Sequence, residues 1–559
     1  MASLSGLLDK ATRSALARKA FNFAVLAFFF GFVLIPSLWV FPHTLTRLDQ
    51  MYTQVIAKPE VLSEAVTSLI RSVEIALAVV VIDVAVGVPV AWILVRRKFM
   101  GKEFLDTLLD LPVTMPTSAL GFSIYLFWAT PRKLSMADLL GLKTGFLSEG
   151  PLLVLALHAV FCLPYVVRSV IGMISELDPT YEYAARTLGA PSFTTFRTVS
   201  LPSIVPGIVS GAILAFTRSV SETGATMIVA GWYETAPVYI KRVCDVNPDA
   251  ASLVTISLIA TSLVLVFALS ALSAYWRVPI VKVLPSLERR LSTAKASAVR
   301  DFVILAFLAV VVFAPTFYIA VAPLQAPPQA QAQRPDSTEF GWDAFAETLV
   351  NSLLIASGAT AVGLLLGLPL AMYISRKLSG RLKVLLDTLV NVSVIVPTSA
   401  LAYSLYLFWG DAPGGLGLFE KGLALVVVVH MVLTFPYVVR PILSALEGLD
   451  PVYEEAALTL GAKPYTVFRT VVLPLIRPAI LAGVVLSFTR SFSETGATVI
   501  ASGAQVRTTV PVLIVGWVKQ AQKLGDQVAL YNASIACALL LGLSYAMLVA
   551  FRLVMGRVK

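Results

Sequence analysis

The sequence contains one long stretch twice. Residues 177–231 read LDPTYEYAARTLGAPSFTTFRTVSLPSIVPGIVSGAILAFTRSVSETGATMIVAG, and residues 449–503 read LDPVYEEAALTLGAKPYTVFRTVVLPLIRPAILAGVVLSFTRSFSETGATVIASG. The second copy follows the first at a constant offset of 272 positions, the difference between 449 and 177. Shared composition does not produce such a match, so the chain contains an internal repeat.

A shorter upstream block extends the repeat over most of the chain. Residues 116–120 read PTSAL, and residues 397–401 read the same five letters. Each half of the chain therefore carries the same series of segments. We expect a first half at residues 1–290 and a second half at residues 291–559.

The composition indicates a membrane protein. Of the 559 residues 57% are apolar and only 14% are charged, whereas about a quarter of the residues in an ordinary soluble domain are charged. The mean hydropathy is +0.83, and apolar runs of about 20 residues, the length that crosses a bilayer as a helix, recur throughout. Six such runs in each half would give the two repeats the same orientation, related by an axis along the membrane normal.

We therefore predict an all-α polytopic membrane protein with about 12 transmembrane helices in two parallel six-helix repeats. The expected spans lie near residues 21–41, 65–95, 104–129, 151–175, 203–230, 251–276, 301–323, 348–374, 385–410, 422–447, 475–502 and 529–552.

The distribution of basic residues predicts the orientation. The chain has a net charge of +10, and most Lys and Arg in short loops fall on the side of the N-terminus. Such a bias marks the cytoplasmic side of a membrane protein. We expect a multi-pass protein of the plasma (inner) membrane with both termini cytoplasmic, in contact with membrane lipid. Nucleic-acid binding is not expected, because the basic residues do not gather on one solvated face with stacking aromatics.

The loop after the fourth span of each half contains a short helical pattern. Asp178-Pro179 and Asp450-Pro451 supply a helix-capping residue and a helix-starting proline. Small residues follow on one helical turn, and Gly189 or Gly461 permits a helix end with positive φ. The sequence predicts two short helices that lie parallel to the membrane and allow close approach of another protein.

This loop resembles the signature loop of the permease subunits of type I ABC importers, in which EAA-x-x-x-G is followed by an apolar-x-Leu-Pro segment. The chain is similar to two such permeases fused in one polypeptide. The resemblance implies two cytoplasmic ABC ATPase subunits as partners, together with an extracytoplasmic solute-binding protein. The implied ATPase-docking residues are Glu182, Tyr183, Ala184, Ala185, Gly189, Glu454, Glu455, Ala456, Ala457 and Gly461.

The two loops differ at one motif position, because Tyr183 stands where Glu455 provides the motif glutamate. The two docking contacts are therefore expected to differ in strength. The chain has no G-x-x-x-x-G-K-[ST] phosphate loop. We expect a non-enzymatic subunit without catalytic residues, metal ligands or a bound cofactor, with ATP and Mg held by the partner ATPase.

Two features within the predicted spans are candidates for the pathway or gate. Prolines interrupt the third helix of each half just before a Thr-Ser pair, which frees backbone groups; a packed kink is the alternative interpretation. Arginine and glutamate spaced i,i+4 in the fifth helix can neutralise each other, and we favour a structural ion pair over a direct role. The candidate residues are Thr117, Ser118, Arg218, Ser221, Glu222, Thr398, Ser399, Arg490, Ser493 and Glu494.

The cargo is indicated by similarity alone. From Leu105 the pattern L-D-x-L-x-D-L-P is similar to sulfate, molybdate and tungstate permeases. The later S-E-T-G-A-T resembles their G-E-F-G-A-T, with Thr223 and Thr495 in place of the aromatic residue. Import of a tetrahedral oxyanion is thus favoured. A ferric-iron or thiamine permease is an alternative because fused halves are familiar there, and an ion-coupled secondary transporter is the alternative from another class.

Overall fold

The computed structural model describes residues 15–275, 285–325, 342–503, 505 and 507–556, and it places no β-strand among them. The chain forms two compact units, each assembled from separate pieces of sequence. Unit 1 contains Met1–Met51, Asp336–Leu513 and Leu540–Lys559, and unit 2 contains Tyr52–Pro335 and Ile514–Leu539.

Ten helices among the described residues are long and apolar enough to span a membrane, or up to 11 if a bent pair counts as one span. The all-α, multi-pass class is therefore confirmed, but the expected number of 12 is not reached. The ten candidates are Lys19–Ser37, Pro59–Arg96, Pro151–Glu176, Ser192–Ser221, Pro248–Leu269, Ala294–Gln325, Trp342–Lys377, Leu423–Gly448, Pro464–Phe492 and Gln527–Met547.

The third helix of each half accounts for the difference, because the continuous spans expected at 104–129 and 385–410 are broken. In the first half the chain forms α7 (Lys102–Leu109), α8 (Leu111–Thr114) and α9 (Thr117–Ala129). The second half forms α23 (Gly380–Val390), α24 (Val392–Ile395) and α25 (Thr398–Trp409), with a bend of 102° before α25. Pro116 and Pro397 lie at these breaks, since proline cannot continue the helical hydrogen bonds.

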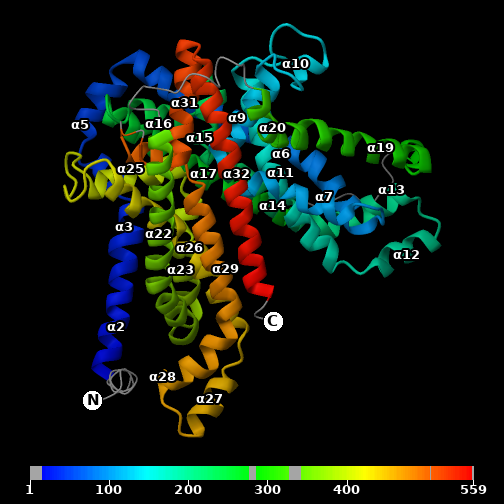
Figure 1. Ribbon diagram of the computed structural model, residues 1–559. Coiled ribbons are helices and arrows are strands. Elements are labelled where there is room, and N and C mark those ends of the chain that lie inside the picture. Colours follow the sequence, from blue (N-terminus) through cyan, green and yellow to red (C-terminus); the bar gives the residue numbers. More distant parts are fainter. Residues whose placement is uncertain (1–14, 276–284, 326–341, 504, 506, 557–559) are drawn as a thin grey trace. The chain divides into compact units, whose positions relative to one another are not determined.

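Three long helices form the centre of each unit (Figure 1). In unit 2 they are α6 (Pro59–Arg96), α11 (Pro151–Glu176) and α14 (Leu201–Ser221), and in unit 1 they are α22 (Trp342–Lys377), α26 (Leu423–Gly448) and α29 (Leu473–Phe492).

Glycines allow two of these helices to approach closely. A Cβ added at Gly211 of α14 would lie 2.8 Å from the Cα of Val166 on α11. A Cβ at Gly483 of α29 would lie 3.1 Å from the carbonyl oxygen of Val438 on α26. The equivalent helix pair therefore packs backbone to backbone in both units, as is common where small residues line membrane-helix contacts.

The first span of each half packs with the other half of the sequence. In unit 1, α2 (Ala15–Phe28), a π-helical turn and α3 (Ile35–Ser37) join helices of the second half, and α3 contacts α25. In unit 2, α20 (Ala314–Val321) contacts α9 of the first half. Each packing unit therefore contains residues of both sequence halves, 1–290 and 291–559.

A serine hydroxyl joins the exchanged first span to its host in each unit. Ser404 of α25 accepts a hydrogen bond from the Val40 backbone N–H at 3.0 Å and donates one to the Pro36 carbonyl at 2.8 Å. The Oγ therefore occupies the place of a direct i→i−4 helical bond, which is a known cause of helix bending. In unit 2, Ser123 of α9 bonds the Ile319 N–H and the Pro315 carbonyl in the same way.

The remaining helices complete the two units. Those of unit 2 are α10 (Met136–Leu139), α12 (Pro179–Thr187), α13 (Ser192–Thr195), α15 (Gly224–Val229), α16 (Ala236–Val243), α17 (Pro248–Tyr275), α18 (Pro285–Leu291) and α19 (Ala294–Phe307). Those of unit 1 are α4 (Val40–Leu45), α5 (Leu48–Met51), α27 (Val452–Thr459), α28 (Pro464–Val467) and α30 (Gly496–Ala501). Two helices, α31 (Val510–Leu524) and α32 (Gln527–Gly556), contribute residues to both units.

Candidate functional site: the loop helices and the broken fifth helices

The loop after the fourth span folds into a short helix in each half, as predicted. In α12 the Asp178 carboxylate accepts the Thr180 backbone N–H at 2.9 Å, and this hydrogen bond lowers the pKa of Asp178. In α27 Asp450 accepts the Val452 N–H at 3.0 Å. These aspartates satisfy backbone donors that a helix start leaves unpaired.

Glycine ends both loop helices in a left-handed conformation. Gly189 and Gly461 each have φ of +87°. The next N–H groups, of Ala190 and Ala462, return to carbonyls in the last helical turn at 3.1 Å. The predicted positive-φ helix end is therefore confirmed in both loops.

The first glutamate of each loop is turned inward. Arg96, the last residue of α6, lies 3.0 Å from the Glu182 carboxylate and donates to the Leu177 carbonyl at 2.9 Å. In unit 1 Arg376 lies 2.8 Å from Glu454 and bonds the Leu449 carbonyl at 3.2 Å. Each pair ties a loop helix to the end of a central helix. The sequence alone does not reveal the partner of either arginine, although both follow the second apolar run of their halves.

The loop helices and the residues that cap them carry exposed apolar side chains next to polar ones. Leu188 is 89% exposed and Leu460 is 87% exposed, while Tyr183 and Glu455 also face outward. The figure places α27 beyond the end of α29 within unit 1 (Figure 1).

Leu188 and Leu460 are exposed apolar residues outside the membrane-spanning segments. Among the expected docking residues, Ala184 and Ala456 are exposed and Ala185 and Ala457 are half-buried. Leu188 and Leu460 are not among the predicted docking residues, although both lie directly before the motif glycine.

The fifth helix of each half is broken between its arginine and its glutamate. Helix α14 ends at Ser221, and Glu222 adopts extended backbone before α15 begins at Gly224. Helix α29 likewise ends at Phe492, two residues before Glu494. The expectation that both charges lie on one continuous helix is therefore wrong, because the helix ends before the glutamate.

The predicted charge pairs nevertheless form across both breaks. Arg218 and Glu222 lie 3.3 Å apart, and Arg490 and Glu494 lie 2.5 Å apart. The carboxylates are only 4% exposed. Each glutamate also accepts a backbone N–H of the short helix that follows, from Ala225 at 3.0 Å and from Ala497 at 2.9 Å. Each buried carboxylate therefore has both an opposite charge and a hydrogen-bond donor as partners, without which its burial would be costly.

A buried histidine from the fourth span holds both sides of each break. His158 bonds Ser219 at 2.8 Å before the break and Thr226 at 2.9 Å after it. His430 bonds Ser491 and Thr498, each at 2.8 Å. Both histidines are therefore hydrogen-bonded core residues.

The remaining candidates lie at helix ends inside the units. Thr117 and Ser118 begin α9, and Thr398 and Ser399 begin α25. Ser118 and Ser399 are fully buried, and their hydroxyls have no hydrogen-bond partner among the described residues. Ser221 and Ser493 lie beside the breaks and bond backbone carbonyls of Thr217 and Arg490.

The aspartates of the L-D-x-L-x-D-L-P pattern bind an arginine of the fourth span. Arg168 donates to Asp106 at 2.6 Å and to both oxygens of Asp110, at 2.8 and 2.7 Å. In unit 1 Arg440 donates to Asp387 and to the amide oxygen of Asn391, each at 2.7 Å. The second half therefore has one carboxylate fewer at this contact.

No group of three or more metal-ligating side chains with suitable spacing occurs in the part of the chain that the structure describes. The two repeats instead present helix junctions, paired charges and exposed loop surfaces.

Comparison with known proteins identifies the family. The model of the binding-protein-dependent transport system inner membrane component matches residues 83–278 and again residues 363–555. The chain therefore belongs to this family of ABC importer permeases and contains its domain twice.

Two relatives illustrate the similarity. The sulfate transport system permease protein CysT of Salmonella typhimurium is 32% identical over 244 residues, which cover 41% of this chain and 83% of the relative. The molybdate/tungstate transport system permease protein WtpB of Pyrococcus furiosus is 31% identical over 246 residues, which cover 43% of this chain and 91% of the relative.

Proposed function

We propose that this chain is the fused permease of an ABC importer that moves a tetrahedral oxyanion of the sulfate, molybdate or tungstate kind. The duplicated family domain and the names of the relatives support this proposal. Residues 1–290 and 291–559 are the two permease halves. The protein lies in the plasma (inner) membrane with both termini cytoplasmic, and it receives its solute from an external binding protein.

Two cytoplasmic ABC ATPase subunits dock on the loop helices and hydrolyse ATP with Mg. The observation that supports this role is that α12 and α27 expose one side, with Leu188 and Leu460 at their ends, while a glutamate on the other side is bonded to a central helix. Glu182 and Glu454 fix each helix to a central helix, so that movement imposed on the loop reaches the membrane-spanning part. The small residues Ala185 and Ala457 allow the partner to approach closely.

The broken fifth helices and the starts of α9 and α25 form the pathway or gate in this proposal. Half-helices that end within a membrane protein present partial charges and free backbone groups to a passing ion. Each arginine is paired with its glutamate, so a direct role in guiding an anion requires that pair to open. Buried, unpartnered Ser118 and Ser399 hydroxyls add hydrogen-bond capacity at these helix starts.

A docking test uses the chain assembled with its ATPase subunits. We expect Ala457→Trp and Ala185→Trp to abolish solute-stimulated ATPase activity while the protein stays folded, because a bulky side chain crowds a close contact. Ala57→Trp, an exposed alanine before α6, is the matched control and should leave activity unchanged. Normal stimulated activity in both loop variants would contradict docking at these helices.

A cargo test uses the cognate solute-binding protein. Sulfate, molybdate and tungstate are offered in parallel with thiamine and ferric iron, and ATPase stimulation is measured for each loaded binding protein. Stimulation by an oxyanion alone supports the proposal. Stimulation by thiamine or ferric iron alone would replace it with the alternative cargo.

A further inference from the structure

Residues 177–200, called the first docking loop below, are bonded to the segment that joins the two sequence halves. Helix α18 of that segment contacts α13 of the loop. The Glu288 carboxylate of α18 is only 6% exposed and lies 3.0 Å from the Arg197 guanidinium. It also accepts a hydrogen bond from the Thr194 hydroxyl at 2.6 Å. Burial of a carboxylate is costly without such partners, so these contacts fix α18 to the loop.

A second set of contacts lies at the end of α18. The Ser292 hydroxyl accepts the Phe193 backbone N–H at 3.0 Å and donates to the Glu288 carbonyl at 2.7 Å. The Ser192 hydroxyl donates to the Ser292 carbonyl at 3.3 Å. Only Ser292 and Thr293 separate α18 from α19, and the Thr293 side chain caps the start of α19. The link between the two helices is short and hydrogen-bonded, so a displacement of α18 should also displace α19.

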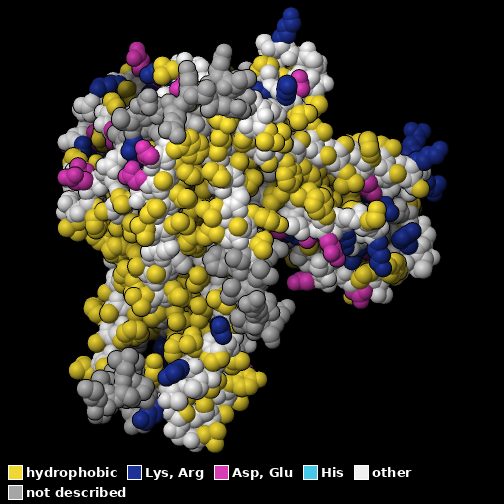
Figure 2. Space-filling view, viewed as in Figure 1, with side chains coloured by type: hydrophobic (Ala, Val, Ile, Leu, Met, Phe, Trp, Pro, Cys, Tyr) yellow, Lys and Arg dark blue, Asp and Glu magenta, His cyan; other side chains and the backbone are white. Residues whose placement is uncertain are grey.

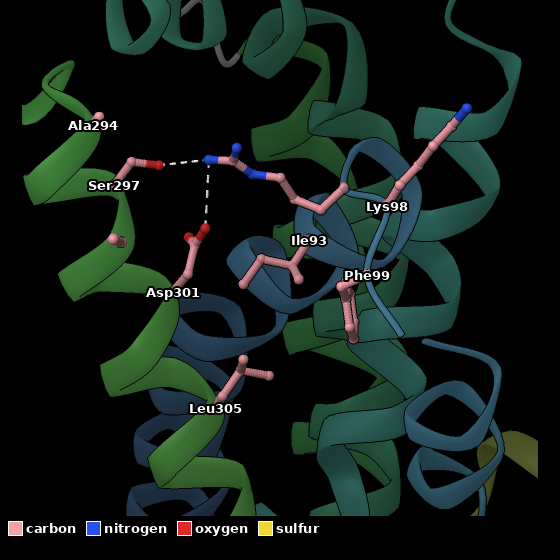
Figure 3. Close-up of a pocket in the computed structure, with 9 residues that line it drawn as sticks. Ile93, Lys98, Phe99, Ala294, Ser297, Asp301 and Leu305 are labelled. Carbon is pink, nitrogen blue, oxygen red and sulfur yellow. Dashed lines mark hydrogen bonds and ion pairs between the residues drawn. The ribbon is translucent and has the colours of Figure 1, made fainter. Parts of the chain in front are cut away.

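The end of α6 holds both the loop and α19 through two adjacent arginines. Arg96 pairs with Glu182 of the loop, whereas Arg97 donates to Ser297 of α19 at 2.6 Å and lies 3.5 Å from Asp301. Figure 3 shows the two contacts with α19 as dashed lines. Figure 2 shows Lys and Arg side chains beside Asp and Glu side chains over α12, α13 and α19. The loop and the joining segment therefore share one group of polar contacts.

Helix α19 belongs to a membrane-spanning segment that reaches a candidate gate helix. Ala294–Gln325 forms one span, and its α20 part contacts α9. There the Ser123 hydroxyl accepts the Ile319 N–H at 3.0 Å. Thr117 and Ser118, two of the pathway candidates, begin α9. A continuous series of contacts thus runs from the first docking loop through α18, α19 and α20 to α9, all within unit 2.

The equivalent positions of the second loop are different. Arg469, which corresponds to Arg197 at the offset of 272 positions, is exposed. Lys377, which follows Arg376 as Arg97 follows Arg96, is exposed as well. Neither side chain forms an ion pair with a residue in the part of the chain that the structure describes. Among those residues, the contact with a joining helix is therefore found at the first loop.

We propose that α18 acts as a brace, which transmits movement of the first docking loop through α19 and α20 to α9. Glu288 is the positioning residue of this brace, because it acts through Arg197 and Thr194 and not by contact with the ATPase or the solute. The inference rests on the proposed function, in which an ATPase subunit moves the loop. Packed helices joined by satisfied polar contacts resist deformation, so a displacement at one end reaches the other.

The complete importer in proteoliposomes, with its ATPase and solute-binding protein, tests the brace. The readout is uptake per ATP hydrolysed, measured with sulfate, molybdate or tungstate, whichever stimulates the wild-type complex. Glu288→Gln and Arg197→Gln should each lower this ratio about fivefold, as expected for residues that couple two sites. The double variant should be no worse than either single variant, because both act through one contact. Glu103→Gln, at an exposed glutamate of α7, is the control and should leave the ratio unchanged.

A merely structural role of Glu288 would give a different result. It would lower the melting temperature or the amount of folded complex, but the uptake per ATP of the complex that remains would be normal. Association of the ATPase, measured by pull-down, should be unchanged in both glutamine variants, because the exposed side of α12 is intact.

An insertion separates transmission from simple stabilisation of the loop. Two glycines inserted between Ser292 and Thr293 keep the contacts of Glu288 but release α19 from α18, because glycine is conformationally permissive. Uptake per ATP should fall about as far as in Glu288→Gln. The same insertion between Lys143 and Thr144, both exposed, is the control. This variant also tests the brace where a Glu288 variant does not fold.

Three outcomes would overturn the brace: a normal ratio in both glutamine variants, a normal ratio after the insertion at Ser292, or loss of ATPase association in Glu288→Gln. The last result would place Glu288 in the docking contact itself. A wild-type complex without solute-stimulated ATPase activity would instead contradict the proposed function. A stimulated wild type with unaffected variants contradicts the brace alone.

Discussion

The buried polar contacts at the breaks of the two fifth helices are the same in both units, whereas the exposed residues of the two loop helices differ. Each break has its charge pair and its histidine, with the same partners at offsets of 272 positions. By contrast, Tyr183 corresponds to Glu455 on the exposed loop faces, and Asp110 corresponds to Asn391 at the arginine contact. Buried polar contacts tolerate little change because an unpaired buried group is costly. Surface positions can change, and they then make the two halves unequal.

The largest effect is expected at the fifth-helix charge pairs. Glu494→Gln leaves the Arg490 charge without its carboxylate in a low-dielectric site, and loss of one member of a buried pair costs about 3–5 kcal/mol. Glu222→Gln should lower the free energy of unfolding by a similar amount, because the two breaks have the same contacts. The melting temperature in detergent is measured for both variants. A large difference between them would contradict the conclusion that the two breaks are stabilised alike.

The double variant Arg490→Gln with Glu494→Gln separates structure from transport. Removal of both charges should restore much of the stability. Restored stability with restored solute uptake would reject an anion-guiding role for this pair. Restored stability without uptake would reject the purely structural interpretation.

The next effect is expected at the serines that hold the exchanged first spans. Ser404→Ala leaves the Val40 N–H and the Pro36 carbonyl without their partner, and a buried unpaired group costs about 1–3 kcal/mol. Ser123→Ala should act alike in unit 2. Thermal unfolding measures both, with Ser203→Ala, an exposed serine, as the control. An unchanged melting temperature would show that the helix closes with a direct i→i−4 bond.

Local features of this fold could be predicted from the sequence. The loop helices follow from Asp-Pro at one end and a motif glycine at the other, all within a dozen residues. The charge pairs follow from i,i+4 spacing, which brings Arg490 near Glu494 even though the helix ends between them. In each case the interacting groups are close in sequence, so no knowledge of tertiary packing is needed.

Long-range features could not be predicted in the same way. Ser404 and Pro36 are 368 positions apart, and no local pattern marks either as a partner of the other. The exchange of first spans and the Arg96–Glu182 anchor likewise depend on which helices pack together. The repeat predicts that a tertiary contact in one half should have an equivalent in the other half, but it does not predict which contacts these are.

A smaller effect is expected at the arginine contacts with the third-helix segment. Arg168→Gln leaves two neighbouring carboxylates, whereas Arg440→Gln leaves one beside an amide, so the first variant should lose more stability. The side chains are 32–43% exposed, and such pairs contribute about 1 kcal/mol or less. Melting temperatures at low and high salt test this order. Asp110→Asn with Arg168→Gln should reduce the loss to that of Arg440→Gln, and an unchanged difference would contradict the charge explanation.

The smallest effect is expected on the exposed faces of the loop helices, where the halves differ most. Glu455 offers a charge to the ATPase and Tyr183 does not, and a charge-assisted hydrogen bond is roughly twice as strong as a neutral one. Glu455→Ala should therefore weaken ATPase association more than Tyr183→Ala, in a pull-down of the ATPase with the purified chain. Tyr183→Glu should strengthen the weaker contact and so make the two halves more alike. Equal losses in the two alanine variants, or no gain from Tyr183→Glu, would show that the sequence difference does not make the two docking contacts unequal.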